Sequence, residues 1–339
     1  MIGVGIVGLG LAVKPHALAL RDLEAAGRLR VVGGFAPSGD RRAAFAAAWG
    51  WPVFGRVDAL LAAPGLDLVL VLTPPRTHLP LAEQAFAAGA DVLVEKPVEW
   101  DAARAQALVE AAARAGRRAA VVFQHRFRPA AQRLKAALDD GALGEILSAS
   151  ASIRWWRDDA YFATPGRGML ARDGGGVLLT QAIHSIDLLL HLAGPVASVT
   201  GFARTSGLRA IDTEDIAAAA LRFANGAIGA IDATTVARPG FPERIEIAGT
   251  RGSAVLAAER LDLHIVGRAP EVIDHGSAGG GGADPMAFDH GPHRAMIAEV
   301  IDAIAQRRVP VNDAATGLPV QRLIEAWLRS AQTGVPQSP

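Results

Sequence analysis

Residues 2–12 of the chain, IGVGIVGLGLA, decide its fold. The run from Ile2 to Val7 has the clustered apolar pattern of a buried strand, and two glycines and a helical stretch follow it directly. Strand, glycine turn and helix in this order bring backbone N–H groups and the positive end of a helix to one point, which suits a pyrophosphate. The sequence therefore predicts a dinucleotide-binding turn made of Gly8, Leu9, Gly10, Leu11 and Ala12.

The rest of the first 123 residues repeats this alternation of strand and helix. Units of this length are typical of a doubly wound parallel sheet. The dinucleotide pattern is incomplete, because Val13 stands where a third Gly or Ala is expected, and the alternative is an α/β scaffold that binds no nucleotide. We expect strands at 2–7, 29–35, 52–54, 67–72, 91–94 and 119–123 and helices at 13–26, 39–49, 57–62, 79–88 and 102–115, with Asp101 as an N-cap.

Composition limits the classes of partner. With 339 residues, of which 50% are hydrophobic, the chain has enough core for two domains. Lys+Arg and Asp+Glu both number 34, so no basic field favours nucleic acid or an anionic membrane. The absence of cysteine excludes disulfides and thiolate catalysis. The apolar amino terminus lacks a basic n-region, and no run approaches the roughly 20 apolar residues of a membrane span. We expect a soluble cytoplasmic protein.

The end of the second strand bears on the choice of dinucleotide. An acidic residue there would bind the ribose 2′-OH of NAD, but Ala36 and Ser38 follow the strand and Arg41 and Arg42 come soon after. A hydroxyl and a guanidinium fork suit a 2′-phosphate, so NADP is favoured, while Asp40 keeps NAD open through a ribose contact. The alternative is a plain helix start with Ser38 as its N-cap.

Two further strand ends face the same edge of the predicted sheet. DVLVEKPV, residues 91–98, reads as a buried strand that delivers Lys96 to the rim of a cleft, with Pro97 keeping the backbone extended. Alternation sends Glu95 and Lys96 to opposite faces, and the alternative is a solvated Lys. Thr73, Pro74 and Pro75 end the strand beginning at Asp67 as a rigid wall; His78 either contacts ribose or phosphate or lies at the start of the next helix.

After Phe123 the pattern changes. A polar crossover that begins with Gln124 and His125 leads to a helix and then to strands without intervening helices, several joined by hairpin turns at 224–226 and 249–252. Such a series predicts a largely antiparallel sheet, so we expect an α/β Rossmann domain at 1–123 and an α+β domain at 124–339. The expected elements are a helix at 130–138, strands at 146–156, 196–203, 216–223, 227–235, 245–248, 254–257 and 261–266, the tract Ser277 to Gly282, and helices at 293–306 and 314–333.

One dense group of polar residues lies between Asp173 and Asp187. A glycine-rich loop becomes a helix on which Thr180 and His184 are four residues apart and share a face. Such a face directed at Lys96 would surround one small site with a hydroxyl, an imidazole and an ammonium group. His184 and Asp187 as metal ligands lack a third partner, so no metal is expected, and a structural histidine is the other alternative.

These motifs together resemble the Gfo/Idh/MocA oxidoreductases. The resemblance runs from Gly8 and Gly10 through Thr73-Pro74-Pro75 and Glu95-Lys96-Pro97 to the glycines before His184 and Asp187. It implies a Rossmann domain, a second domain whose open sheet forms homodimers or homotetramers, and a hydride-transfer site lined by Lys96 and His184. Thr180 departs from the family, whose members commonly have Asp there. The expected cofactor contacts also include Glu95, Gln124 and His125.

The expected chemistry is oxidation of an alcohol or reduction of a carbonyl group. An imidazole titrates near neutral pH, so His184 is the expected acid and base, with Lys96 polarising the oxygen. The alternative is that burial beside the nicotinamide lowers the Lys pKa and the two side chains exchange roles. Aromatic faces and guanidinium groups suit a polyhydroxylated ring and leave open an acidic one. We expect a small substrate, a sugar, sugar acid or cyclitol; the alternatives are an aromatic dihydrodiol or hemiacetal, a cofactor-using glycosidase, or a sensor. Expected substrate contacts are Arg126, Trp156, Arg157, Tyr161, Arg167 and Thr180, with at most one of Trp155 and Trp156 on the site.

Overall fold

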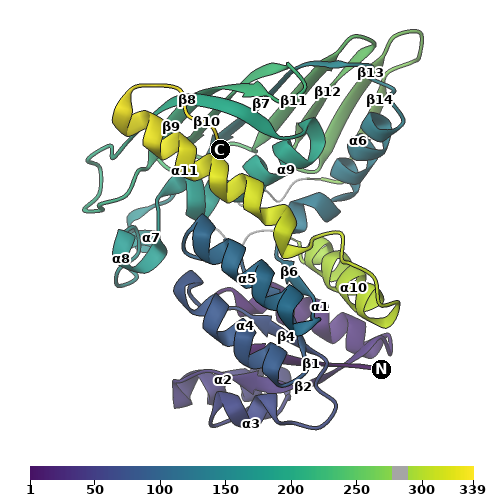
Figure 1. The fold of residues 1–339 in the computed structure, drawn as a ribbon, viewed down its shortest axis with the longest axis vertical. Helices are drawn as coiled ribbons and strands as arrows, with labels where there is room; N and C mark the ends of the chain where they lie inside the picture. Colours follow the sequence, from purple (N-terminus) through teal and green to yellow (C-terminus); the bar gives the residue numbers. More distant parts are fainter. Residues whose placement is uncertain (277–288) are drawn as a thin grey trace. The chain divides into compact units, whose positions relative to one another are not determined.

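A computed structural model describes residues 1–276 and 289–339 (Figure 1). The chain divides into one unit of residues 1–124 and 290–318 and another of residues 125–276, 289 and 319–339. The division lies one residue after the expected boundary, but 290–318 groups with the first unit instead of the second. The reason is tertiary: α10 (Gly291–Ala305) lies against α1 (Val13–Ala25), and Asn312 donates to the Val121 carbonyl over 2.7 Å. The tract from Ser277 to Gly282 lies outside the described residues.

The sheet of the first unit is parallel throughout, in the strand order β3-β2-β1-β4-β5-β6. Its central strands β4 and β5 are buried along their whole length, which explains their continuous apolar runs. The predicted doubly wound fold is therefore confirmed. The strands are β1 Ile2–Val7, β2 Leu29–Phe35, β3 Val53–Phe54, β4 Leu68–Val71, β5 Asp91–Val94 and β6 Ala119–Val121, and the other helices are α2 Gly39–Trp49, α3 Val57–Leu61, η1 Pro75–Thr77, α4 His78–Ala87, α5 Ala102–Ala115 and η4 Ala314–Gly317.

The strand order reverses between β1 and β4. Val7 and Val71, the last residues of these two strands, are register partners, so the segments that follow them leave the sheet side by side. In open α/β sheets ligands bind at this switch point, outside the carboxyl ends of the strands. The fold therefore brings the glycine turn after β1 next to the Thr73 segment after β4.

The second unit contains an eight-stranded sheet in the order β14-β13-β12-β11-β7-β10-β9-β8. All neighbours are antiparallel except β7 and β10, which confirms the mostly antiparallel prediction and both hairpins. The sequence did not indicate β14, an edge strand of four residues in which Val272 and Asp274 are exposed. The strands are β7 Ile146–Arg154, β8 Val196–Arg204, β9 Ile216–Phe223, β10 Ile228–Thr234, β11 Arg244–Gly249, β12 Gly252–Ala257, β13 Arg260–Ile265 and β14 Glu271–Asp274.

Helices cover one face of this sheet and leave the other open (Figure 1). Burial alternates along β9, as expected when only one face is covered. The segment Leu170–Ala193 is long and apolar enough to span a membrane, but 83% of its most apolar window is buried inside the unit, as in a core helix. The helical elements are η2 Gln124–Phe127, α6 Pro129–Asp139, α7 Asp159–Phe162, α8 Leu170–Asp173, the π-helical turn η3 Leu178–Ala182, α9 Ile183–Ala193 and α11 Leu318–Thr333.

Candidate active site

The two glycines of the first turn differ in whether the fold itself requires a glycine at that position. Gly8 has φ +105°, and a Cβ there would lie 2.5 Å from the Leu72 carbonyl oxygen, so the protein itself requires glycine. A Cβ on Gly10 would meet only the Arg41 Nη1 atom at 3.9 Å. Nothing in the unit requires glycine at position 10, so the turn keeps open space above its backbone. This space and the acid-free first turn of α1 fit a dinucleotide pyrophosphate.

The neighbouring side chains of the turn differ in how much of their surface is exposed. Leu9 is buried, and Ala12 directly before α1 is half-buried. Leu11 is 63% exposed, which is high for an apolar side chain beside a core strand. A bound dinucleotide would shield Leu11 from water, so we retain its expected contact as a prediction.

The segment after β2 has mostly local hydrogen bonds. Ser38 Oγ accepts from the Arg41 amide at 3.3 Å, so Ser38 is the N-cap of α2. Arg42 Nη1 donates to the carbonyls of Ala36 at 2.6 Å and Pro37 at 2.9 Å. Arg41 is the arginine that reaches the glycine turn. Arg41 is therefore better placed than Arg42 for a cofactor phosphate.

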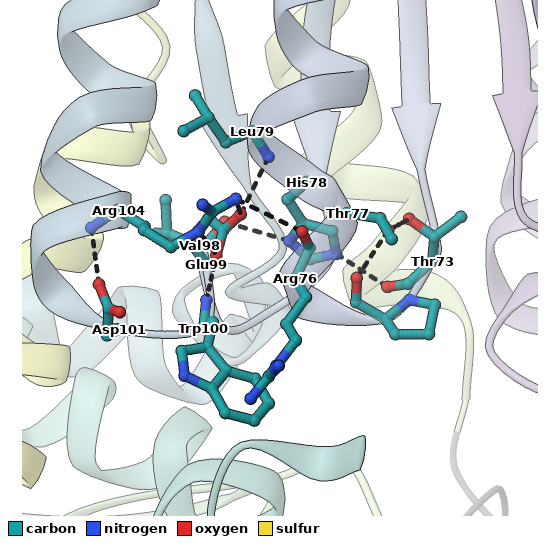
Figure 2. A network of polar contacts seen from close by, with 11 residues as sticks. Thr73, Arg76, Thr77, His78, Leu79, Val98, Glu99, Trp100, Asp101 and Arg104 are labelled. Atoms are coloured by element: carbon teal, nitrogen blue, oxygen red, sulfur yellow. Dashed lines mark hydrogen bonds and ion pairs between the residues drawn. The ribbon is translucent and has the colours of Figure 1, made fainter. Parts of the chain in front are cut away.

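His78 fixes the wall that ends β4 (Figure 2). It is fully buried, with Nε2 2.8 Å from the Thr73 carbonyl oxygen and Nδ1 3.1 Å from that of Val98. Both ring nitrogens thus face backbone carbonyls, which favours the structural reading of His78 over contact with ribose or phosphate. Pro74 is exposed and Pro75 half-buried, so the wall itself remains accessible.

Glu99 is a buried carboxylate whose importance the sequence did not indicate. It is fully buried and accepts from the Leu79 amide at 3.2 Å and the Trp100 amide at 2.5 Å. Arg104 adds two donors, Nε at 3.0 Å and Nη2 at 2.8 Å (Figure 2), and this hydrogen bonding raises the pKa of Arg104. The segment just beyond Lys96 is therefore clamped to α4 and α5. The sequence held one signal for this cluster, because Arg104 lies three residues after the predicted N-cap Asp101. In the structure the Asp101 carboxylate accepts the Arg104 amide at 2.7 Å.

Glu95 is tied to the helix that follows the glycine turn. Its Oε1 lies 2.9 Å from Nε2 of His16 in α1, and its Oε2 accepts the backbone amide of Lys96 at 3.0 Å. The His16 ring also meets the His293 ring edge-on at 5.0 Å. Glu95 and Lys96 are both half-buried. The carboxylate that was expected to contact the cofactor thus holds the backbone of Lys96.

In the second unit, the glycine-rich loop packs closely against Glu214. A Cβ on Gly176 would lie 2.0 Å from the Glu214 carbonyl oxygen, and Gly174 has φ +78°. The Glu214 carboxylate accepts the amides of Gly176 and Leu178, each at 3.1 Å. Burial raises the pKa of Glu214. The backbone therefore passes close to Glu214 as it enters η3.

Thr180 lies in a π-helical turn and not in the regular helix that the sequence suggested. Its hydroxyl donates to the Gly176 carbonyl over 2.7 Å. Such turns occur often at functional sites, and here the turn directly precedes His184 in α9. The four-residue spacing therefore does not stack Thr180 on His184 as it would in an α-helix.

His184 is 9% exposed and lies against the ring of His125, with ring centroids 5.0 Å apart. Arg128 Nη2 is 2.8 Å from His125 Nε2. Since a guanidinium only donates, His125 Nε2 must be the acceptor and carries no proton. His125 is thus held in one tautomer beside His184. Gln124, the neighbouring predicted cofactor contact, is also buried, at 9% exposure.

Arg126 forms a buried ion pair with Asp187. Its Nε and Nη2 donate to the two carboxylate oxygens over 2.7 Å and 2.5 Å. Such bidentate geometry favours a structural role over the expected substrate contact. The same ion pair occupies the carboxylate of Asp187, one of the two residues considered as metal ligands. The described ranges contain no group of three His, Cys, Asp or Glu positioned for a metal.

The predicted substrate residues meet around Gln181, which the sequence did not single out. Arg157 is almost fully buried and donates from Nε to Gln181 Oε1 over 3.0 Å, and Gln181 Nε2 donates to the Tyr161 hydroxyl over 2.6 Å. Burial raises the pKa of Tyr161. The Arg167 guanidinium lies 4.9 Å from the Tyr161 ring centroid. Gln181 thus connects these loops to the helix of His184.

The adjacent tryptophans face different surroundings, as strand alternation predicts. Trp155 is 7% exposed, whereas Trp156 is half-buried between two guanidinium groups, those of Arg209 at 4.9 Å and Arg238 at 4.3 Å from its ring centroid. Trp156 is the less buried member of the pair, and its contact with the substrate stays a prediction.

Comparison with known proteins extends over both units. Residues 2–123 match an oxidoreductase family with an NAD-binding Rossmann fold, and residues 131–255 match the GFO/IDH/MocA C-terminal domain. The inositol 2-dehydrogenase of Rhizobium meliloti is 30% identical over 76% of each chain. The D-apiose dehydrogenase of Paraburkholderia graminis is 29% identical over 97% of this chain and 87% of the relative. The WlbA dehydrogenase from Bordetella pertussis, solved with NADH and UDP-GlcNAcA, has a TM-score of 0.86 and 29% identity over 100% of this chain and 98% of that one.

Proposed function

Because the chain belongs to the GFO/IDH/MocA family of NAD-binding oxidoreductases, we propose that it transfers a hydride between a nicotinamide dinucleotide and a secondary alcohol or ketone of a sugar, sugar acid or cyclitol. The open glycine turn at the switch point of the first sheet carries the proposal, since no residue of the unit needs glycine at position 10. The substrate class is supported by the relatives, which are named for inositol and D-apiose.

Three side chains have proposed roles in catalysis. When bound, the nicotinamide accepts or donates the hydride at C4. His184 takes the hydroxyl proton on oxidation and returns it on reduction, and Lys96 polarises the same oxygen. An ordinary Lys pKa of about 10.4 would leave Lys96 some 4 kcal/mol from useful as a base at pH 7, whereas imidazole starts close to that pH. Thr180 cannot hold a negative charge in place of the family's Asp, and its hydroxyl already donates to Gly176.

NADP preference is the finer part of the proposal. No carboxylate directly follows β2, and the Arg41 guanidinium, at the start of α2, would donate a charge-assisted hydrogen bond to the 2′-phosphate of NADP. The WlbA structure contains NADH, so the two coenzymes must be compared directly. Arg41→Ala should raise the KM for NADP about tenfold and leave that for NAD little changed. Arg42→Ala is the matched control, and an equal effect on both coenzymes would contradict the preference.

The open face of the second sheet supports assembly into a homodimer or homotetramer. It exposes Phe202 at 77% and Ile228 at 63%, on β8 and β10. Exposed apolar side chains grouped on one face are typical of an interaction surface. Light scattering should show a dimer or tetramer that Phe202→Asp with Ile228→Asp converts to monomer, and a monomeric wild type would disprove the assembly.

The function is tested by following nicotinamide absorbance with a panel of aldoses, uronates, inositols and glycosides. We expect net reduction of the coenzyme by at least one polyol, lost in Lys96→Ala and His184→Gln while coenzyme binding persists. Cleavage of a glycoside without net reduction would identify a glycosidase instead. Coenzyme binding without any turnover would indicate a sensor. Full turnover by Lys96→Ala would refute the role of that residue.

A further inference from the structure

We propose that the substrate carries an anionic group, a carboxylate or a phosphate, which Arg209 and Arg167 bind in the second unit. The inference rests on the proposed function and narrows its substrate class. Arg209 lies in the loop between β8 and β9, and Arg167 lies in the loop between α7 and α8. Arg209 was not among the residues predicted from the sequence.

Aromatic rings hold both guanidinium groups in place. The Arg209 Cζ atom is 4.9 Å from the Trp156 ring centroid and 4.7 Å from that of Phe162. Tyr161 and Phe162 meet edge to face at 5.0 Å, and Arg167 lies over the Tyr161 ring. Stacking supports the planar face of a guanidinium and leaves its in-plane N–H groups to bind an acceptor. The rings of Trp156, Phe162 and Tyr161 thus form an aromatic platform that holds the two arginines in position.

The hydrogen-bonding capacity of these two arginines is only partly used. The side chain of Arg209 is 4% exposed, and Nη2 donates to the carbonyls of Arg157 and Thr235. Its buried Nε and Nη1 atoms, and the buried Nε of Arg167, have no hydrogen-bond acceptor within residues 1–276 and 289–339. Buried donors without an acceptor cost free energy, and charged donors cost most. An anion with two or three oxygens would satisfy them.

The acidic residues of these loops make no hydrogen bond to these donors, and four of them accept a backbone amide instead. Asp158 accepts that of Tyr161 at 3.0 Å, Asp173 that of Gly168 at 2.7 Å, and Asp212 that of Leu170 at 2.6 Å. Asp215 forms a buried ion pair with Arg209, 3.7 Å from Nη1 and therefore beyond hydrogen-bond range, and its carboxylate accepts the Ser206 amide and hydroxyl, both at 2.6 Å. Asp159 is exposed at the start of α7. The protein thus uses its carboxylates to shape the loops and leaves N–H groups for a ligand.

The platform is connected to the helix of His184. Gln181 in η3 donates to the Tyr161 hydroxyl, and His184 follows three residues later. An anion on Arg209 and Arg167 is therefore expected to belong to the molecule whose alcohol His184 deprotonates. This combination describes a uronate or another sugar acid, or a sugar phosphate.

Binding to the NADH-loaded protein tests the inference without requiring turnover. Isothermal calorimetry would compare D-glucose with D-glucuronate and D-glucose 6-phosphate, and D-galactose with D-galacturonate. At least one acidic sugar should bind about tenfold or more tightly than its neutral partner, as expected for a charge-assisted hydrogen bond. Tighter binding of the uronate or of the phosphate identifies the anion. No acidic sugar binding more tightly than its neutral partner would overturn the inference.

Variants of the two arginines test whether these side chains bind the anionic group. Arg209→Gln and, separately, Arg167→Gln should weaken binding of the acidic sugar about 10- to 100-fold and leave the neutral sugar unchanged. Arg209→Lys should retain part of the preference, and thermal unfolding and NADH titration check that each variant is folded. Arg244→Gln is the matched control, because Arg244 forms an exposed ion pair with Glu246 on β11. An undiminished preference in both glutamine variants would refute the assignment.

Turnover of the same samples separates this inference from the proposed function. Coenzyme reduction by neutral sugars with no preference for acids would overturn the anion site and leave the oxidoreductase standing. Tight, arginine-dependent binding of an acid without any turnover would retain the site and refute the proposed reaction.

Discussion

The His16 imidazole lies 2.9 Å from the carboxylate of Glu95, the residue directly before Lys96. His16 is fully buried in α1, the helix that begins just after the glycine turn, and Glu95 holds the Lys96 amide with its other oxygen. One chain of hydrogen bonds thus joins the helix of the proposed coenzyme site to the backbone of the proposed electrophile. The position of Lys96 is set by a residue 80 positions earlier in the chain.

Replacing His16 should affect turnover more than coenzyme binding. His16→Leu removes the partner of Glu95 and should lower kcat about tenfold, because the Lys96 backbone loses its fixed position. His16→Gln can still donate to the carboxylate and should retain most of the activity. Steady-state kinetics and NADH titration distinguish the two. Equal kcat in the wild type and His16→Leu would show that this contact does not position Lys96.

The two glycines of the first turn should respond differently to alanine. Gly8→Ala places a Cβ 2.5 Å from a backbone oxygen at φ +105° and should destabilise the fold by about 2 kcal/mol or more. Gly10→Ala should unfold like the wild type but bind NADH at least tenfold more weakly, because its Cβ takes the space of the pyrophosphate. Urea unfolding and NADH titration measure both effects. Unimpaired NADH binding by Gly10→Ala would remove the main support for the coenzyme site.

Breaking the Arg126–Asp187 ion pair should be costly. Asp187→Ala leaves a buried guanidinium without its bidentate partner, and we expect a loss of about 3–5 kcal/mol in the free energy of unfolding. The exposed pair of Arg154 and Asp232 is the control, and Asp232→Ala should cost about 1 kcal/mol or less. Urea titrations provide both values. Similar costs for the two variants would show that Asp187 is not the counter-ion the geometry indicates.

His191 should make the protein less stable in mild acid. Burial, with a smaller effect of Arg126, lowers the pKa of His191 from 6.5 to about 4. The unfolded state therefore binds the proton first as pH falls from 6.5 to 4, and stability declines through this window. After allowance for partial solvent exposure, His191 should account for about 1–2 kcal/mol of that decline. His191→Gln should flatten the curve of unfolding free energy against pH, and an unchanged acid slope would refute this origin.

The sequence predicted the elements well where their signals are local. Buried apolar runs and capping residues lie within a few positions of each other. The predicted N-cap Asp101 accepts an amide three residues later, and so does Ser38, for which the N-cap was the alternative to a phosphate contact. The same local signals fixed the glycine turn and the change to an antiparallel sheet after residue 123.

The sequence by itself thus determined the family, the two architectures and the strand ends that hold the candidate residues, because short-range patterns encode secondary structure. Only the tertiary structure decided what each polar side chain does. Arg126 pairs with Asp187 across 61 positions, Glu214 shapes the loop at Gly176 across 38, and Arg209 lies over Trp156 without an acidic hydrogen-bond partner. The chain contains 34 basic and 34 acidic side chains, and composition cannot say which of them meet. Their roles depend on contacts that form only when distant segments fold together, because burial and geometry set the energy of a charge.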